Sequence, residues 1–139
     1  MKSTIFIFFV ILVAGCSSLT NKKNPPDKGG LELGLKLVDR ESTEYNPAKG
    51  IELIESNASI DYQVSSAALC LALLGIEEIR DVAKGHPWCF VSMKLGGKES
   101  GSSAELAGIA TAHLAANGSF AEAMKKANEL YETIKTPNQ

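Results

Sequence analysis

An apolar segment of fifteen residues, MKSTIFIFFVILVAG, opens the chain and limits how much of it can fold into a domain. Lys2 gives the segment a positive start, and Ile5 to Val13 form its apolar centre. These nine residues would rise only about 14 Å as a helix, which is too short to cross ~30 Å of hydrocarbon. The segment therefore has the character of an export signal rather than of a membrane anchor. We expect residues 1–15 to be removed and the folded domain to lie in the remainder.

The residues at the end of this segment carry a more specific signal. Val13-Ala14-Gly15-Cys16 resembles the processing box of bacterial lipoproteins, in which an aliphatic residue and two small residues precede a Cys. In that class the Cys becomes the first residue of the mature chain and carries acyl chains. The resemblance implies lipidation of Cys16 and attachment to the periplasmic face of a bacterial membrane. The alternative is an ordinary secretory peptide in which Cys16 is incidental.

The residues after Cys16 indicate where the anchored domain would stand. In enteric bacteria an Asp after the lipidated Cys retains the protein at the inner membrane, so Ser17 favours the outer membrane. Residues 17–30, SSLTNKKNPPDKGG, are polar, have no apolar period and contain a Pro pair and a Gly pair. We expect a flexible tether with a reach of roughly 20 Å. The lipid anchor would be the only contact with the membrane.

The next segment predicts a strand. Residues 31–38, LELGLKLV, alternate apolar and polar side chains with the period of a β-strand. Residues 90–93 are a weak candidate for its partner, and a strand without a partner is not stable. We therefore assign residues 16–45 to the acylated Cys, the tether, and an irregular or short extended segment.

Residues 46–139 have the periodicity of a helical domain. Asn46-Pro47 is a typical helix start, and the short helix that follows should end at Asn57. A cap at Ser59 or Asp61 then begins a long helix that runs to about residue 83. This helix is apolar on most of its faces, which predicts a central, buried position. A long loop over residues 84–101 should follow it.

The C-terminal third predicts a helix hairpin over residues 102–135. Ser102 and Ser119 each precede a Glu by three residues, which is the pattern of a capping box. Asn117-Gly118 between them is a helix stop. The expected fold is thus mainly α, a small bundle of about four helices with one disulfide.

The disulfide follows from the compartment. An exported chain folds under oxidising conditions, where Cys70 and Cys89 form an even pair once Cys16 carries lipid. Such a bridge would close a loop of nineteen residues, which contributes about 3 kcal/mol in the chain-entropy model. The alternative is two free thiols, with Cys70 buried and Cys89 exposed.

Composition and motifs argue against several functions. The formal net charge of −2 and the scattered lysines do not fit a nucleic-acid-binding protein. The sequence has no Ser-His-Asp, G-x-S-x-G or H-E-x-x-H element. His86 and Cys89 have a metal-like spacing, but two ligands do not make a zinc site, and His113 should lie on a packed helix face. We expect no enzyme activity, no metal and no cofactor.

Four segments in residues 46–135 follow one another in a recognisable order: Gly50-Ile51-Glu52-Leu53-Ile54, Cys70-Leu71-Ala72-Leu73-Leu74-Gly75, Trp88-Cys89-Phe90 and residues 103–134. The order of these features is similar to that of the Rap/Tai family of periplasmic immunity proteins. These small helical proteins neutralise peptidoglycan-amidase effectors of type VI secretion. In that family the cysteines at the two ends of the domain fall near Asn57 and Ile134 here, where this chain has none, and Val91 replaces a Pro.

The resemblance implies steric inhibition, in which a loop of a rigid body enters the substrate groove of an amidase. The loop at residues 92–101 is long, Gly-rich and charged, so we expect partner binding through Lys94, Gly96, Gly97, Lys98 and Glu99. Two alternatives remain, a structural or accessory envelope lipoprotein and a small periplasmic chaperone. A second copy of the chain, forming a homodimer, is a further candidate partner.

Overall fold

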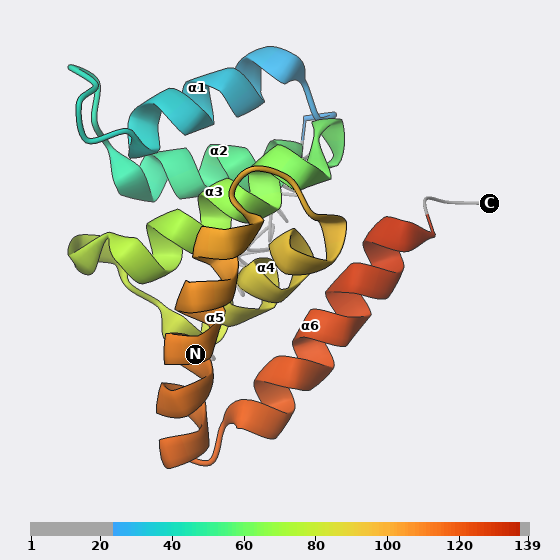
Figure 1. The fold of residues 1–139 in the computed structure, drawn as a ribbon. Helices are drawn as coiled ribbons and strands as arrows, with labels where there is room; N and C mark the ends of the chain where they lie inside the picture. Colours follow the sequence, from blue (N-terminus) through green and yellow to red (C-terminus); the bar gives the residue numbers. More distant parts are fainter. Residues whose placement is uncertain (1–23, 137–139) are drawn as a thin grey trace, which may run out of the picture.

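The computed structural model describes residues 24–136, and all regular structure in this range is helical (Figure 1). The expected mainly α fold is confirmed, with one disulfide between Cys70 and Cys89. The described residues contain more helices than the four that the sequence suggests. They are α1 (Lys28–Val38), α2 (Pro47–Asn57), η1 (Ala58–Ile60), α3 (Tyr62–Gly75), η2 (Glu77–Ile79), α4 (Val82–Leu95), α5 (Ser100–Ala116) and α6 (Phe120–Lys135).

The predicted strand over residues 31–38 is wrong, because this segment forms helix α1. The Asp27 side chain accepts a hydrogen bond from the Gly30 N–H and caps the helix, so residues 28–30 belong to α1 and not to the tether. Leu31, Gly34 and Leu37 are buried at a spacing of three residues, which a helix places on one face. Helix α1 packs along α2 and is part of the folded body (Figure 1).

Helix α2 begins and ends where the sequence predicts. The Asn46 side chain accepts a hydrogen bond from the Lys49 N–H, and Pro47 occupies the first turn. At the other end, the buried Asn57 accepts a hydrogen bond from the Asp27 N–H at 2.7 Å and donates one to the Leu53 carbonyl. This side chain fastens the start of the described chain to the end of α2.

The predicted long helix is divided in two. Asp61 caps α3, as expected for one of the two proposed caps, but the helix ends at Gly75 and the chain turns through η2. Two hydrogen bonds hold the turn, from the Asp81 N–H to the Leu73 carbonyl and from the Arg80 side chain to the Leu74 carbonyl. Residues 77–79 therefore form a short turn of 3-10 helix and do not continue a long helix.

The expected long loop over residues 84–101 is mostly helix α4, capped by the side chain of Asp81. The segment 90–93, a weak strand candidate, lies inside this helix. Pro87 stands within α4 and did not prevent the helix. Only residues 96–99 remain as a loop between α4 and α5.

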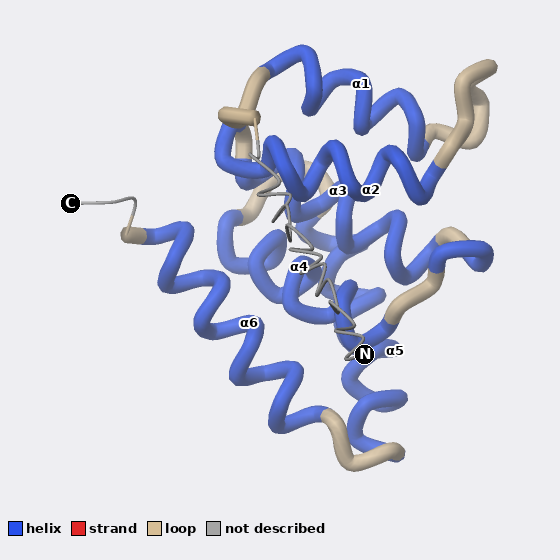
Figure 2. Tube along the Cα trace, turned by 180° about the vertical axis from the view of Figure 1, so that it is seen from behind, coloured by secondary structure: helices blue, strands red, loops and turns tan. Residues whose placement is uncertain are grey.

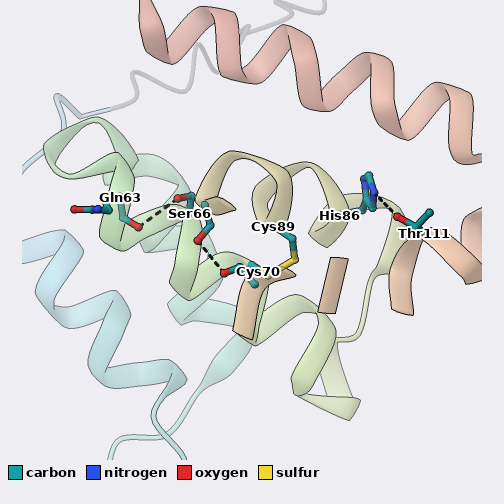
Figure 3. Close-up of a disulfide and its surroundings, with 8 residues drawn as sticks. Gln63, Ser66, Cys70, His86, Cys89 and Thr111 are labelled. Carbon is teal, nitrogen blue, oxygen red and sulfur yellow. Dashed lines mark hydrogen bonds between the residues drawn. A yellow bond between two sulfur atoms is a disulfide. The ribbon is translucent and has the colours of Figure 1, made fainter. Parts of the chain in front are cut away.

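The core lies around α3 and α4, where the disulfide forms as predicted. Cys70 on α3 and Cys89 on α4 are joined by an S–S bond of 2.09 Å, and both residues are fully buried (Figure 3). Trp88 packs against the apolar cluster around Leu69 and against the cluster that contains the disulfide. The middle of the molecule is therefore cross-linked covalently and packed from both sides.

Helices α5 and α6 form the expected hairpin around Asn117–Gly118, where Gly118 has a φ of 76°. The predicted capping boxes are not formed, because α5 begins at Ser100 and the Ser119 side chain makes no capping bond. Figure 2 shows the two helices diverging from their turn, and α6 packs mainly on α4. Among residues 24–136, no helix combines the length and apolar character that crossing a membrane requires.

Candidate protein-binding groove

The loop of residues 96–99 contains four of the five residues that the sequence singles out for partner binding. Gly96 and Gly97 adopt positive φ angles of 75° and 107°, which only glycine adopts without strain. The Ser100 hydroxyl donates a hydrogen bond to the Gly97 carbonyl at 2.9 Å and closes the turn. Lys98 and Glu99 are exposed at its tip.

The helices that flank this loop are held together beneath it. The Ser92 and Ser103 hydroxyls lie 2.8 Å apart in the protein interior and join the end of α4 to the start of α5. Gln63 on the first turn of α3 donates a hydrogen bond to the Leu95 carbonyl at 3.5 Å. The loop is therefore short and fixed at both of its ends.

Lys94, the fifth predicted residue, takes a different direction. It lies on the last turn of α4, and its Nζ is 5.4 Å from the centre of the Phe90 ring, a cation–π distance. It does not line the hollow beside the loop. The structure thus groups Gly96, Gly97, Lys98 and Glu99 and sets Lys94 apart from them.

A hollow of about 600 Å³ lies between this loop and the outer face of α3. We call it the α3 groove and define it by the residues that line it. Its floor is apolar, Val64 is 42% exposed, and its polar side chains lie at the loop end. The lining residues are Gln63, Val64, Ala67, Ala68, Leu71, Gly96, Gly97, Lys98 and Glu99.

A second apolar hollow of about 380 Å³ continues the α3 groove along the helix. Ala68 and Leu71 line both hollows, which makes them neighbours. Leu35 and Val38 of α1 form the other wall, and the charged pair Asp39 and Arg40 lies at its edge. Apolar surface therefore follows α3 from its first turn to its last.

Sequence reasoning missed the part of this groove that α3 contributes. Val64, Ala67 and Leu71 follow a helical period, and we assigned them to the buried side of a central helix. Ala67 is buried, but Val64 is exposed and Leu71 is half-buried. Helix α3 is apolar on all sides, so its apolar residues do not show which side the other helices leave exposed.

A buried histidine lies away from the groove, where α4, α5 and α6 meet. His86 is 2% exposed, and its Nε2 lies 3.2 Å from the Thr111 hydroxyl (Figure 3). Its ring meets the Phe120 ring edge-on at 5.9 Å, and its buried Nδ1 has no hydrogen-bond partner within the described chain. Burial lowers the pKa of His86, because the charged ring would lose its hydration.

Two other predicted sites have different outcomes. His113 is exposed and does not lie on a packed face, because the packed side of α5 follows Ser103, Ala107, Ala110 and Leu114. Cys16 lies outside the described residues. Within residues 24–136, no three His, Cys, Asp or Glu side chains gather in a way that could hold a metal ion.

Comparisons of the chain with protein-family models, with curated proteins and with solved structures found no match.

Proposed function

We propose that this chain is a non-enzymatic lipoprotein of the bacterial envelope that acts by binding another protein through the α3 groove. The observation that carries the proposal is the apolar groove itself, with a fixed, charged loop at one end. Apolar floors with a few polar groups at the rim are typical of surfaces that bind peptides and proteins. The disulfide across α3 and α4 supplies a rigid support for such a surface.

The proposed partner is a peptidoglycan amidase effector, which the chain would block as an immunity protein. The loop of residues 96–99 projects as a short turn, and the hydrogen bonds of Gln63 and Ser100 fix its shape. A preformed loop loses little conformational freedom when it binds, which favours tight binding. Inhibition would be steric, because the loop fills the substrate groove of the enzyme and no reaction is needed.

The test is a pull-down from envelope extract with the lipidated chain, followed by a hydrolysis assay. Stoichiometric recovery of an amidase, and loss of its peptidoglycan hydrolysis when the chain is added, would support the immunity function. Recovery of secretion or envelope subunits without an amidase would contradict it. The chain would then be an accessory envelope lipoprotein.

Charge reversals locate the binding surface in that assay. We expect Lys98→Glu and Glu99→Lys each to weaken binding about tenfold or more, because both charges lie at the tip of the loop. Lys125→Glu on α6 and Glu105→Lys on α5 are matched controls, since both residues are exposed and lie outside the groove. Equal dissociation constants for all four variants, measured by calorimetry, would rule out the loop as the contact.

The buried His86 favours a second candidate, a periplasmic chaperone that responds to acid. The burial of His86 between three helices becomes unfavourable once its ring is protonated. The packing of the helices around it would then weaken. A light-scattering assay with an aggregating client separates the two functions. Suppression of aggregation at low pH but not at pH 7 would support the chaperone, and no effect at either pH would exclude it.

A further inference from the structure

The α3 groove and the hollow that continues it are neighbours along α3, because Ala68 and Leu71 line both, and we call the two together the channel. The channel extends from Val64 to Gly75, a helical rise of about 17 Å. Its floor contains small residues, Ala67, Ala68, Ala72 and Gly75. Apolar side chains of α1 border its far half. A long, thin, apolar ligand fits this shape better than a compact side chain of a partner protein does.

The polar groups of the channel are distributed unequally. Gln63, Lys98 and Glu99 stand at the end nearest the start of α3. The middle of the channel has only apolar lining, and Asp39 with Arg40 lies at the far edge. This distribution suits an amphiphile whose polar end lies at the first turn of α3 and whose tail extends toward α1.

The described chain begins beside the end of α2, one short 3-10 helix before the start of α3. The Asp27 N–H binds the Asn57 side chain, and the residues from Asn57 through η1 lead directly into α3 (Figure 1). Ile60 at the end of η1 is 43% exposed and adds apolar surface before Val64. Cys16 lies eight positions before Asn24, so the connecting chain spans at most about 26–29 Å. A connection of this length would allow an acyl group on Cys16 to reach along the body toward the start of α3.

We propose that an acyl chain carried by Cys16 lies in the α3 groove while the protein is away from a membrane. The inference rests on the lipid anchor of the proposed function. Attachment makes binding intramolecular, so a modest affinity is enough to fill the groove. A bilayer surrounds an acyl chain on all sides, whereas the groove covers one side, so the acyl chain moves into the bilayer when a membrane is present. On the anchored protein the groove would then be open to a partner, whereas away from a membrane a partner would have to displace the acyl chain.

The test uses the full chain, produced in cells that are fed a fatty acid with a photoreactive diazirine group. The mass of the purified protein reports whether Cys16 is acylated. The protein is diluted below the micelle concentration of its detergent and irradiated, and the cross-linked peptides are identified. We expect cross-links to residues 62–75 and 96–99 of the same molecule. In vesicles the cross-links should instead go to lipid.

Two variants and one control make the outcome specific. Ala68→Arg fills the channel, and Val64→Glu places a charge at its exposed entrance, so each should reduce these cross-links at least tenfold. Val64→Glu keeps the test valid if Ala68→Arg does not fold. Ala112→Arg on the exposed face of α5 should leave the cross-links unchanged.

The contrary results are distinct. Cross-links spread over the whole surface, cross-links between molecules, or cross-links that persist in Val64→Glu would overturn the inference and leave the lipid anchor intact. A mass without acyl chains on Cys16 would overturn both the anchor and the inference. Neither result decides the binding test with Lys98→Glu, which measures the affinity for a partner and not the position of the acyl chain.

Discussion

His86 illustrates how one residue can set a property of the whole protein. It sits at the junction of three helices with a hydrogen bond to Thr111 and a buried Nδ1 that has no partner in the described chain. The charged residues that line the hollow beside Pro87 are exposed, Asp81 and Lys84 at the start of α4 and Lys126 on α6, where Lys126 pairs with Glu122. Burial alone lowers the pKa of His86.

The lowered pKa predicts a loss of stability in acid. An unfolded chain binds the proton at a pKa of about 6.5, whereas the folded chain resists it. The contribution of His86 to the free energy of unfolding is therefore fully present above pH 6.5. It decreases as the pH falls below that value. Urea denaturation at pH 7.5 and pH 5.5 measures the difference in the free energy of unfolding.

The control is His86→Gln, which keeps a hydrogen-bonding side chain near Thr111 and does not titrate. We expect this variant to lose much of the decrease between pH 7.5 and pH 5.5. An equal decrease in both proteins would assign the pH dependence to other groups.

Residues with a local role were predicted correctly only in part, because the capping boxes expected at Ser102 and Ser119 do not form. Asn46 and Asp61 cap helices as expected, because a cap depends only on the three or four residues that follow it. His113 was placed incorrectly, because its burial depends on which face of α5 meets α3 and α4. A helix cap depends on residues nearby in the sequence, whereas the burial of a side chain depends on residues far away in the sequence.

At the scale of elements, two glycines mark a close approach between α1 and α2. A Cβ atom on Gly34 would lie 2.9 Å from Ile54 Cγ1 and 3.1 Å from the Gly50 carbonyl oxygen. A Cβ atom on Gly50 would lie 2.9 Å from the Gly34 carbonyl oxygen. The two glycines let the backbones of the helices come together, and any side chain would push them apart.

We expect Gly34→Ala to destabilise the protein by about 1–3 kcal/mol, because the added methyl group meets backbone atoms that cannot move aside. Gly108→Ala on α5 is the matched control, since a Cβ atom there has no neighbour within 4 Å. The control should gain roughly 0.5–1 kcal/mol from helix propensity. Urea denaturation of both variants gives the comparison, and equal effects would show that α1 and α2 are not in close contact.

The errors at this scale share one cause. The Leu residues of 31–38 alternate with polar residues, but positions 31 and 35 also lie on one helix face, so the pattern fits both structures. The break after Gly75 depends on hydrogen bonds from Arg80 and Asp81 back to α3. Periodicity describes single elements well, but it does not report the contacts that end them.

The disulfide acts on the whole molecule, because it joins the two central helices. Its closed loop of nineteen residues predicts a loss of about 3 kcal/mol when both cysteines are replaced by Ala. The small cavities left by two fully buried sulfur atoms add to that loss. Chemical denaturation of Cys70→Ala/Cys89→Ala measures the change, and a loss under about 1 kcal/mol would show that packing alone holds α3 to α4.

The candidate site could be predicted only in part. The loop was recognisable from Gly96 and Gly97, because adjacent glycines followed by charges are typical of exposed turns. The wall that α3 provides was not recognisable, because the uncovered side of this helix depends on where α1 and α5 pack. Lys94 lies on the last turn of α4 beside Phe90 and not in the loop, and its part in partner binding stays a prediction.

The central claim is that the α3 groove and its loop form the surface that binds a protein partner. Amide hydrogen exchange of the chain, alone and in complex with the amidase recovered in the pull-down, tests it most directly. We predict slower exchange in residues 62–71 and 96–103, with α6 unchanged. Protection confined to α6 or to the outer face of α5, with residues 62–71 unaffected, would contradict the account.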